Sequence, residues 1–149
     1  MKGLIQRVSK ASVTVDGDVV GQIEQGLLLL LGVEKSDDET LARKLCRRVS
    51  RYRVFPDDLG RMNLSLMDCG GSLLVVPQFT LVADTRSGNR PGFSEAGAPE
   101  HARHLFEVFS DEAASTLGEG RVATGRFGAD MKVSLVNEGP VTFALEARN

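Results

Sequence analysis

The stretch Leu27-Leu28-Leu29-Leu30-Leu31-Gly32-Val33 has no polar residue on either face. A strand with one face in water alternates apolar and polar residues, so this run predicts a central strand that is covered on both faces. It is also the longest apolar run in the chain, and it is much shorter than the roughly 18 residues that indicate a membrane span. We therefore expect a buried strand at the centre of a sheet and no contact with a membrane.

Strand and turn signals continue on the amino-terminal side of this run. Residues Leu4 to Val15 read as one long strand with a bend near Lys10-Ala11. Asp16-Gly17 is a hairpin signal, and Val19 to Ile23 reads as the returning strand. Gln25-Gly26 then turns the chain into the central strand, so antiparallel pairing is expected here.

Two helices are expected after the central strand. Apolar residues recur every three or four positions from Glu39 to Tyr52, and a second such pattern follows Pro99, which suits the first turn of a helix. Ser36 or Asp37 is the expected cap of the first helix. The apolar stripes are Leu41, Leu45, Val49 and Tyr52 in the first helix, and Ala102, Leu105, Phe106, Phe109, Ala113 and Leu117 in the second.

The remaining segments read as short strands, except for a polar stretch from Thr85 to Ala98 that is too long for a tight turn and is expected to be a functional loop. Taken together, the pattern predicts the α+β class, with a mostly antiparallel sheet and two helices in a single domain over residues 1–149. The further expected strands are Met62–Leu66, Ser72–Gln78, Arg121–Phe127, Met131–Val136 and Val141–Glu146.

Charge and cysteine content narrow the class of protein. The formal net charge of −2 argues against a protein that wraps duplex nucleic acid, whereas holding a single-stranded end needs few phosphate contacts. Cys46 and Cys69 show no CxxC pattern, so they predict two free thiols in a reducing compartment. Because no leader-like segment is seen either, a cytoplasmic protein is expected.

Two short stretches interrupt the strand pattern in the second half of the chain. Gly139-Pro140 lies between the strand-like segments Met131–Val136 and Val141–Leu145; its glycine has no β-carbon and its proline has no N–H to donate. Such a pair is either a plain turn or a shaped recognition edge. The polar residues Gln78 and Thr80 end an apolar strand, so they are candidates for a functional site.

Around these positions, Gln78-Phe79-Thr80-Leu81 and Asn137-Glu138-Gly139-Pro140-Val141-Thr142 closely resemble the two signature motifs of the D-aminoacyl-tRNA deacylases. The opening Leu4-Ile5-Gln6-Arg7-Val8 with Ala11-Ser12-Val13 is similar to the amino terminus of that family, so the resemblance covers essentially the whole chain. One residue departs from the family pattern: the first motif usually begins with serine, and this chain has Pro77.

The resemblance implies a proofreading hydrolase that frees tRNA of D-amino acids, and of glycine mischarged on tRNA-Ala, by cleaving the ester at the 3′-terminal adenosine. It implies a barrel-like fold, a homodimer with the active site at its interface, and neither metal nor cofactor. It assigns catalysis to Gln78, Phe79 and Thr80, and selection against L-amino acids to Asn137, to Arg7 and to Gly139 and Pro140 in a cis peptide.

The chemistry at Thr80 leaves two alternatives. A threonine nucleophile needs a nearby base, and no base adjoins Thr80 in the sequence. Main-chain N–H groups near Phe79 and Thr80 would instead form an oxyanion hole, with the 2′-hydroxyl of the tRNA assisting the attack of water. His101 and His104 are expected to be exposed on the second helix, where neither a catalytic triad nor a metal site is favoured.

A non-catalytic alternative remains open at this point. A β-rich module that binds RNA 3′ ends or small ligands would have the same strands and would protect a tRNA ester without releasing the amino acid. A purely structural dimer would leave the polar residues Gln78 and Thr80 at the end of an apolar strand unexplained.

Overall fold

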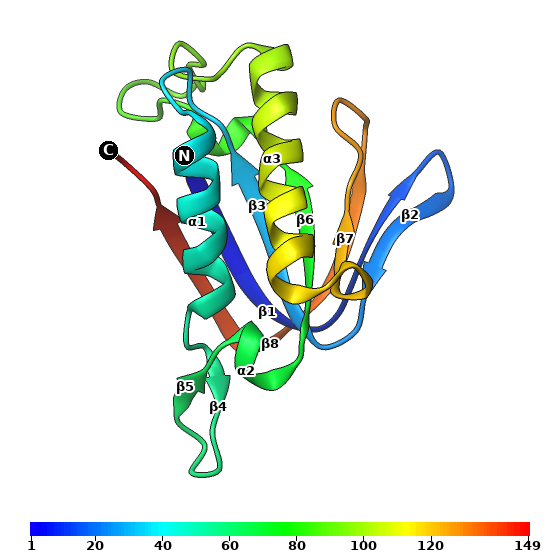
Figure 1. Ribbon diagram of the computed structural model, residues 1–149. Coiled ribbons are helices and arrows are strands. Elements are labelled where there is room, and N and C mark those ends of the chain that lie inside the picture. Colours follow the sequence, from blue (N-terminus) through cyan, green and yellow to red (C-terminus); the bar gives the residue numbers. More distant parts are fainter.

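Eight strands and three α-helices build the structure, a computed structural model that describes residues 1–149 (Figure 1). The strands are β1 (Lys2–Val15), β2 (Asp18–Ile23), β3 (Gly26–Gly32), β4 (Phe55–Pro56), β5 (Met62–Leu64), β6 (Ser72–Pro77), β7 (Val122–Thr124) and β8 (Lys132–Glu146). The helices are α1 (Glu39–Arg51), α2 (Leu66–Cys69) and α3 (Pro99–Leu117), with two short 3-10 helices, η1 (Phe79–Val82) and η2 (Glu119–Arg121).

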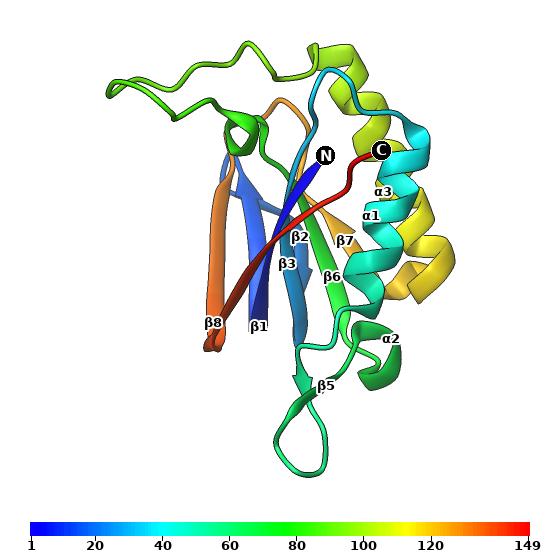
Figure 2. The same cartoon turned by 90° about the vertical axis from the view of Figure 1, so that its left-hand side faces the viewer.

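The long strand β1 organises the main sheet. Its first half pairs antiparallel with β3, its second half pairs antiparallel with β2, and β8 pairs antiparallel with both halves. The ladder between β1 and β8 is irregular on either side of Val8, where the sheet folds over, so the predicted bend lies slightly earlier than Lys10-Ala11. Figure 2 shows the resulting shape from the side, with β8 and β1 opposite the helices.

The prediction of a mostly antiparallel sheet is correct for β1 and its partners and wrong for the rest of the main sheet. Strands β3, β6 and β7 lie parallel to one another, which makes the sheet mixed. The reason lies in the two crossovers: α1 lies on the connection from β3 to β6, and α3 lies on the connection from β6 to β7. Helical crossovers of this kind join parallel strands.

A close approach of β2 to β7 nearly closes the sheet into a barrel. A β-carbon built on Gly21 of β2 would lie 2.4 Å from the carbonyl oxygen of Thr124 in β7, a distance that only glycine permits. The α+β, barrel-like fold is therefore confirmed.

The prediction that the central strand is covered on both faces is confirmed. Leu27, Leu29 and Leu31 of β3 face the helices and belong to a large core with the inner faces of α1 and α3. Leu28 points into the barrel, where it belongs to a second core with Val13 and other residues of β1, β2 and β6. Both helices cover the same face of the sheet (Figures 1 and 2).

The helix ends show where local signals are correct and where they mislead. Pro99 begins α3 as predicted. The cap of α1 is Asp38, whose side chain accepts the N–H of Leu41 at 2.9 Å, rather than Ser36 or Asp37. The strand predicted for Met62–Leu66 ends at Leu64, because Ser65 and Asp68 form a capping box that starts α2, a short helix that was not predicted. None of the helices combines the length and hydropathy that a membrane crossing requires.

The carboxyl-terminal strands differ from the prediction in one important respect. The segments expected as two strands, Met131–Val136 and Val141–Glu146, belong to the single strand β8. Gly139-Pro140 is therefore not a turn. It lies in a bulge, because Asn137 pairs with Val8 and Thr142 pairs with Gln6, which leaves four residues of β8 opposite Arg7 alone.

Candidate functional site

The bulge in β8 presents exposed main chain at the fold of the sheet. Glu138, Gly139 and Pro140 are all exposed, and the Gly139–Pro140 peptide bond is cis. Gly139 has a φ of +135°, a conformation that is essentially restricted to glycine. The chain thus uses glycine here because no other residue fits the backbone.

Side chains from β1 and β8 hold this bulge in place. Arg7 donates from Nε to the carbonyl oxygen of Glu138 at 3.1 Å and from Nη1 to the carbonyl oxygen of Val54 at 2.6 Å. Asn137 spans the bulge, because its Oδ1 accepts the N–H of Val141 at 3.1 Å while its Nδ2 donates to Oγ1 of Thr142 at 3.0 Å. The Arg7 and Asn137 side chains, both singled out from the sequence, are thus brought together with Gly139 and Pro140.

The first motif lies where β6 ends and the 3-10 helix η1 begins. The hydrogen bonds of η1 begin with the N–H of Leu81, which donates to the carbonyl oxygen of Gln78 at 3.2 Å. The N–H groups of Phe79 and Thr80 precede this bond and have no acceptor within the helix. The Gln78 amide donates to the Thr80 hydroxyl, and no histidine or carboxylate contacts that hydroxyl. This end of β6 therefore offers free main-chain donors rather than an activated side chain.

A hollow of about 510 Å³ lies beside this motif, between the end of β6 and the start of α3. Its lining is mostly apolar, which suits a flat organic group more than an ion. Pro77, the residue that departs from the motif that the sequence resembles, is among the lining residues. The lining residues are Leu31, Val33, Val76, Pro77, Gln78, Phe79, Gly97, Pro99, Ala102, Phe106, Phe127, Gly128, Ala129, Met131 and Val133.

The polar loop predicted to be functional does reach this motif. Phe93 of the loop packs against Phe79, with ring centroids 5.2 Å apart, although the two side chains remain 40% and 61% exposed. Asp84 pairs with Gly92 in an isolated bridge that closes the loop. The Arg86 guanidinium forms two bonds of 2.8 Å to Asp84 and holds the pKa of that carboxyl well below its usual range. This ion pair is therefore charged at all physiological pH values.

The two motifs lie far apart within one chain. Pro77 at the end of β6 pairs with Leu31, whereas Arg7, opposite the bulge, pairs with Leu27. Leu31 and Leu27 are four residues apart on β3, so the two motifs are separated by about 13 Å along the strands. Going from β8 through β1 and β3 to β6 crosses three strand spacings, which add roughly 14 Å across the sheet. In Figure 2, η1 lies near the top of the sheet and the bulge at its lower end. One chain therefore does not bring Gln78–Thr80 to Gly139-Pro140.

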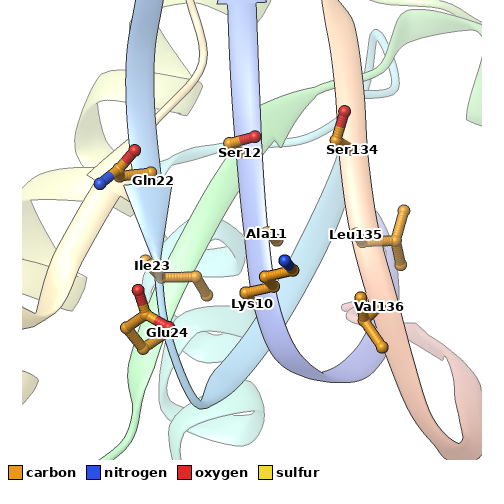
Figure 3. A pocket seen from close by; sticks show the side chains of 9 residues that line it. All are labelled: Lys10, Ala11, Ser12, Gln22, Ile23, Glu24, Ser134, Leu135 and Val136. Carbon is orange, nitrogen blue, oxygen red and sulfur yellow. The ribbon is translucent and has the colours of Figure 1, made fainter.

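A second hollow lies on the outer face of β1, β2 and β8, close to the bulge (Figure 3). It has a volume of about 290 Å³ and is lined by Lys10, Ala11, Ser12, Gln22, Ile23, Glu24, Ser134, Leu135 and Val136. Val136 at its rim is 44% exposed. No histidine or cysteine lines it, and none of the site residues singled out from the sequence does.

The histidines lie on α3, away from both motifs. His104 is exposed, as predicted, and its Nε2 lies 2.7 Å from Oε1 of Glu39. His101 is half-buried rather than exposed. Its ring lies beside Gly97, and its Nε2 is buried without a hydrogen-bond partner. No group of three or more His, Cys, Asp or Glu side chains is arranged to hold a metal ion.

With this geometry in view, comparison with known proteins assigns the family. Residues 4–146 match the family described as D-Tyr-tRNA(Tyr) deacylase. The chain is 65% identical over 147 residues to a D-aminoacyl-tRNA deacylase of Marinobacter nauticus, covering 99% of this chain and 94% of that protein. It is 60% identical to a D-aminoacyl-tRNA deacylase of Vibrio cholerae, covering 99% of this chain and all of that protein.

The chain belongs to the D-aminoacyl-tRNA deacylase family. The family predicted from the two motifs is thus confirmed, and so is the prediction of an enzyme that hydrolyses an ester.

Solved structures agree with the family at the level of the fold. A structure titled as a c-Myc DNA unwinding element binding protein superposes with a TM-score of 0.95 at 35% identity, covering 100% of both chains. A probable eukaryotic D-amino acid tRNA deacylase superposes with a TM-score of 0.86 over 97% of this chain and 98% of that one, at 17% identity. The second likeness extends the fold of the deacylase family to a distant sequence.

Proposed function

We propose that this chain cleaves D-aminoacyl-tRNA at a site shared between two subunits of a homodimer. In this site Glu138–Pro140 of one subunit faces Gln78–Thr80 of the other. The proposal is carried by the separation of the two motifs, which lie at opposite ends of the sheet. Glu138–Pro140, Phe79 and Thr80 are exposed, and Gln78 is half-buried. Because each chain then has half of a site at each end, a symmetric pair completes two sites at once.

Hydrolysis at this site uses main-chain N–H groups rather than an ionisable side chain. The free N–H groups of Phe79 and Thr80 polarise the ester carbonyl and stabilise the oxyanion that forms when water attacks its carbon. The carbon–oxygen bond to the ribose then breaks, and the 3′-oxygen takes up the proton that the water gives up, with the tRNA 2′-hydroxyl assisting the transfer. The Gln78 amide bonded to the Thr80 hydroxyl, with no base beside it, supports this scheme over a threonine nucleophile.

Selection against L-amino acids falls to the main chain of Gly139 and Pro140. A fixed backbone wall excludes a side chain by its direction, whatever its chemistry, which suits an enzyme that accepts many D-amino acids. Arg7 and Asn137 support this role because they tie the bulge at Glu138 and Val141. Glycine has no side chain to exclude, so glycine attached to tRNA-Ala is a further substrate of the same site.

The hollow beside Phe79 is the proposed binding site of the 3′-terminal adenosine. Its volume of about 510 Å³ and its apolar lining suit a base and its ribose. Aromatic Phe79 at its edge gives a surface for stacking, which does not require the basic excess of a duplex binder.

The test compares matched D- and L-aminoacyl-tRNA, and glycyl-tRNA-Ala, by the release of free amino acid. Release from the D-ester and from glycine, with the L-ester intact, supports the proposal. Binding of the tRNA that protects the ester without any release would instead favour a non-catalytic module for RNA 3′ ends.

A further inference from the structure

Thr142 occupies the point where the bulge of β8 rejoins the ladder with β1. Its partner across the ladder is Gln6, and the irregular stretch begins directly after this pair. A residue at this point sets how far the four bulged residues extend from the sheet, because it fixes one end of the bulge while Asn137 fixes the other. Thr142 is also exposed, so a buried core does not determine its orientation.

The hydroxyl of Thr142 links both strands at this point. Its Oγ1 accepts from Nδ2 of Asn137 at 3.0 Å and from Nε2 of Gln6 at 3.4 Å. Asn137 uses its other amide atom, Oδ1, for the N–H of Val141. The Asn137 side chain is thus oriented by Thr142 and in turn holds the main chain immediately after Pro140.

We propose that Thr142 is a positioning residue for the chirality filter: its hydroxyl fixes Asn137, and through it the placement of Gly139-Pro140. This inference rests on the proposed function, because it concerns the same wall. Arg7 binds the bulge only at Glu138, directly before Gly139-Pro140. Asn137, which Thr142 orients, binds the bulge at Val141, directly after Gly139-Pro140. Loss of the hydroxyl frees one side of the bulge, so an L side chain is excluded less strictly.

The test uses a pair of variants that differ only in the hydroxyl or the methyl group. Thr142→Val keeps the shape and removes the hydroxyl, whereas Thr142→Ser keeps the hydroxyl and removes the methyl. The expected result for T142V is a ratio of D to L hydrolysis that falls by about three- to tenfold, the range of one ordinary hydrogen bond. T142S is expected to restore the ratio. Ser134→Ala, an exposed hydroxyl on the same strand without such bonds, is the matched control and leaves the ratio unchanged.

Urea denaturation separates positioning from folding. Solvent-exposed hydrogen bonds add little to global stability, so T142V is expected to unfold at nearly the wild-type urea concentration while its D to L ratio falls. A double-mutant cycle with Asn137→Ala is expected to be non-additive in that ratio, because both residues act through one bond.

Three results would overturn the inference. A T142V variant with the wild-type ratio would remove the hydroxyl from the filter, and a T142S variant as defective as T142V would show that the methyl group matters instead. Additive effects of N137A and T142V would separate the two residues. Failure of the proposed function is distinguishable from these results, because the wild-type protein would then show no preference for the D-ester at all.

Discussion

Substitution of Gly139 by alanine perturbs the proposed wall by one methyl group. The backbone at Gly139 has a φ of +135°, and a β-carbon built there would lie 2.6 Å from Cγ2 of Val141, 3.1 Å from the Val141 nitrogen and 3.2 Å from Nη2 of Arg7. Two of these contacts are with Val141, the residue that Asn137 holds, and the third is with Arg7, the arginine that binds the bulge at Glu138. The methyl group therefore cannot enter without displacing the main chain.

The expected magnitude follows from the conformation. A non-glycine residue in this region of backbone space costs about 1–3 kcal/mol. If the bulge relaxes to relieve this cost, the geometry that separates D from L is lost by a similar free energy, which corresponds to roughly a fivefold to hundredfold change in a rate ratio. Single-turnover hydrolysis of matched D- and L-aminoacyl-tRNA measures this ratio directly.

A matched control variant is available in the same chain. Gly120 in η2 has no heavy atom within 4 Å of a built β-carbon, so Gly120→Ala is expected to keep the wild-type ratio. If Gly139→Ala also keeps wild-type rates on both esters, Gly139 is not part of the filter and the reasoning from its backbone is refuted.

Four further predictions follow from the same structure. Thr80→Ala is expected to retain single-turnover hydrolysis within about tenfold of wild type, since main-chain donors remain; complete loss with tRNA binding intact would indicate a threonine nucleophile. His104→Gln removes the hydrogen bond that contributes most to lowering the pKa of Glu39, yet the dependence of kcat/KM on pH between about 5 and 8 is expected to stay unchanged; a lost inflection would place a histidine in the mechanism. Burial raises the pKa of Cys46 to about 12, so at pH 8 it is a protonated thiol, and mass spectrometry after iodoacetamide treatment should find the label on Cys69 alone; labelling of Cys46 in folded protein would contradict its burial. Arg121→Met removes four hydrogen bonds to carbonyl groups of three segments and is expected to lower the free energy of unfolding in urea by about 2–4 kcal/mol, whereas an unchanged midpoint would show that those bonds are replaceable.

The elements that the sequence predicted well are those whose pattern is local and strongly periodic. The run Leu27–Leu31 lacks any polar position, and this alone indicates a strand covered on both faces, as the two cores on either side of β3 confirm. The helical stripes of α1 and α3 are equally local. The residues that the spacing predicts are buried in both helices, except Tyr52, which follows the end of α1 and is half-buried.

The errors concern features that another part of the chain decides. The parallel pairing of β3 with β6 depends on where α1 packs, which local alternation does not encode. Likewise, β8 pairs with β1 both before and after Gly139-Pro140, so this dipeptide does not turn the chain. Only the register of the two strands shows this, and the local sequence does not encode it. Two local signals were also missed: the cap of α1 is Asp38, and Ser65 and Asp68 have the spacing of a capping box at the start of α2.

The sequence predicted the two sets of residues in the candidate site but not where the sets lie relative to each other. Sequence resemblance singled out Gln78–Thr80 and Asn137–Pro140 together with Arg7, and the second set does lie together around the bulge. The distance between the two sets is a property of the whole sheet, about four residues along the strands and three strands across. This distance is the ground on which we propose that a second copy of the chain completes the site.

The most direct test of the shared site is complementation between two chains that each lack D-selective hydrolysis for a different reason. One chain carries Gly139→Ala together with Arg7→Ala, which disables the wall, and the other carries Phe79→Pro, which removes a main-chain donor of the proposed oxyanion hole. After the two are denatured and refolded together, random pairing gives dimers in which about a quarter of all sites are intact. The account predicts that D-selective hydrolysis returns to about that fraction of the wild-type rate in the mixture. No recovery, in a mixture shown to contain mixed dimers, would contradict a site built from two subunits.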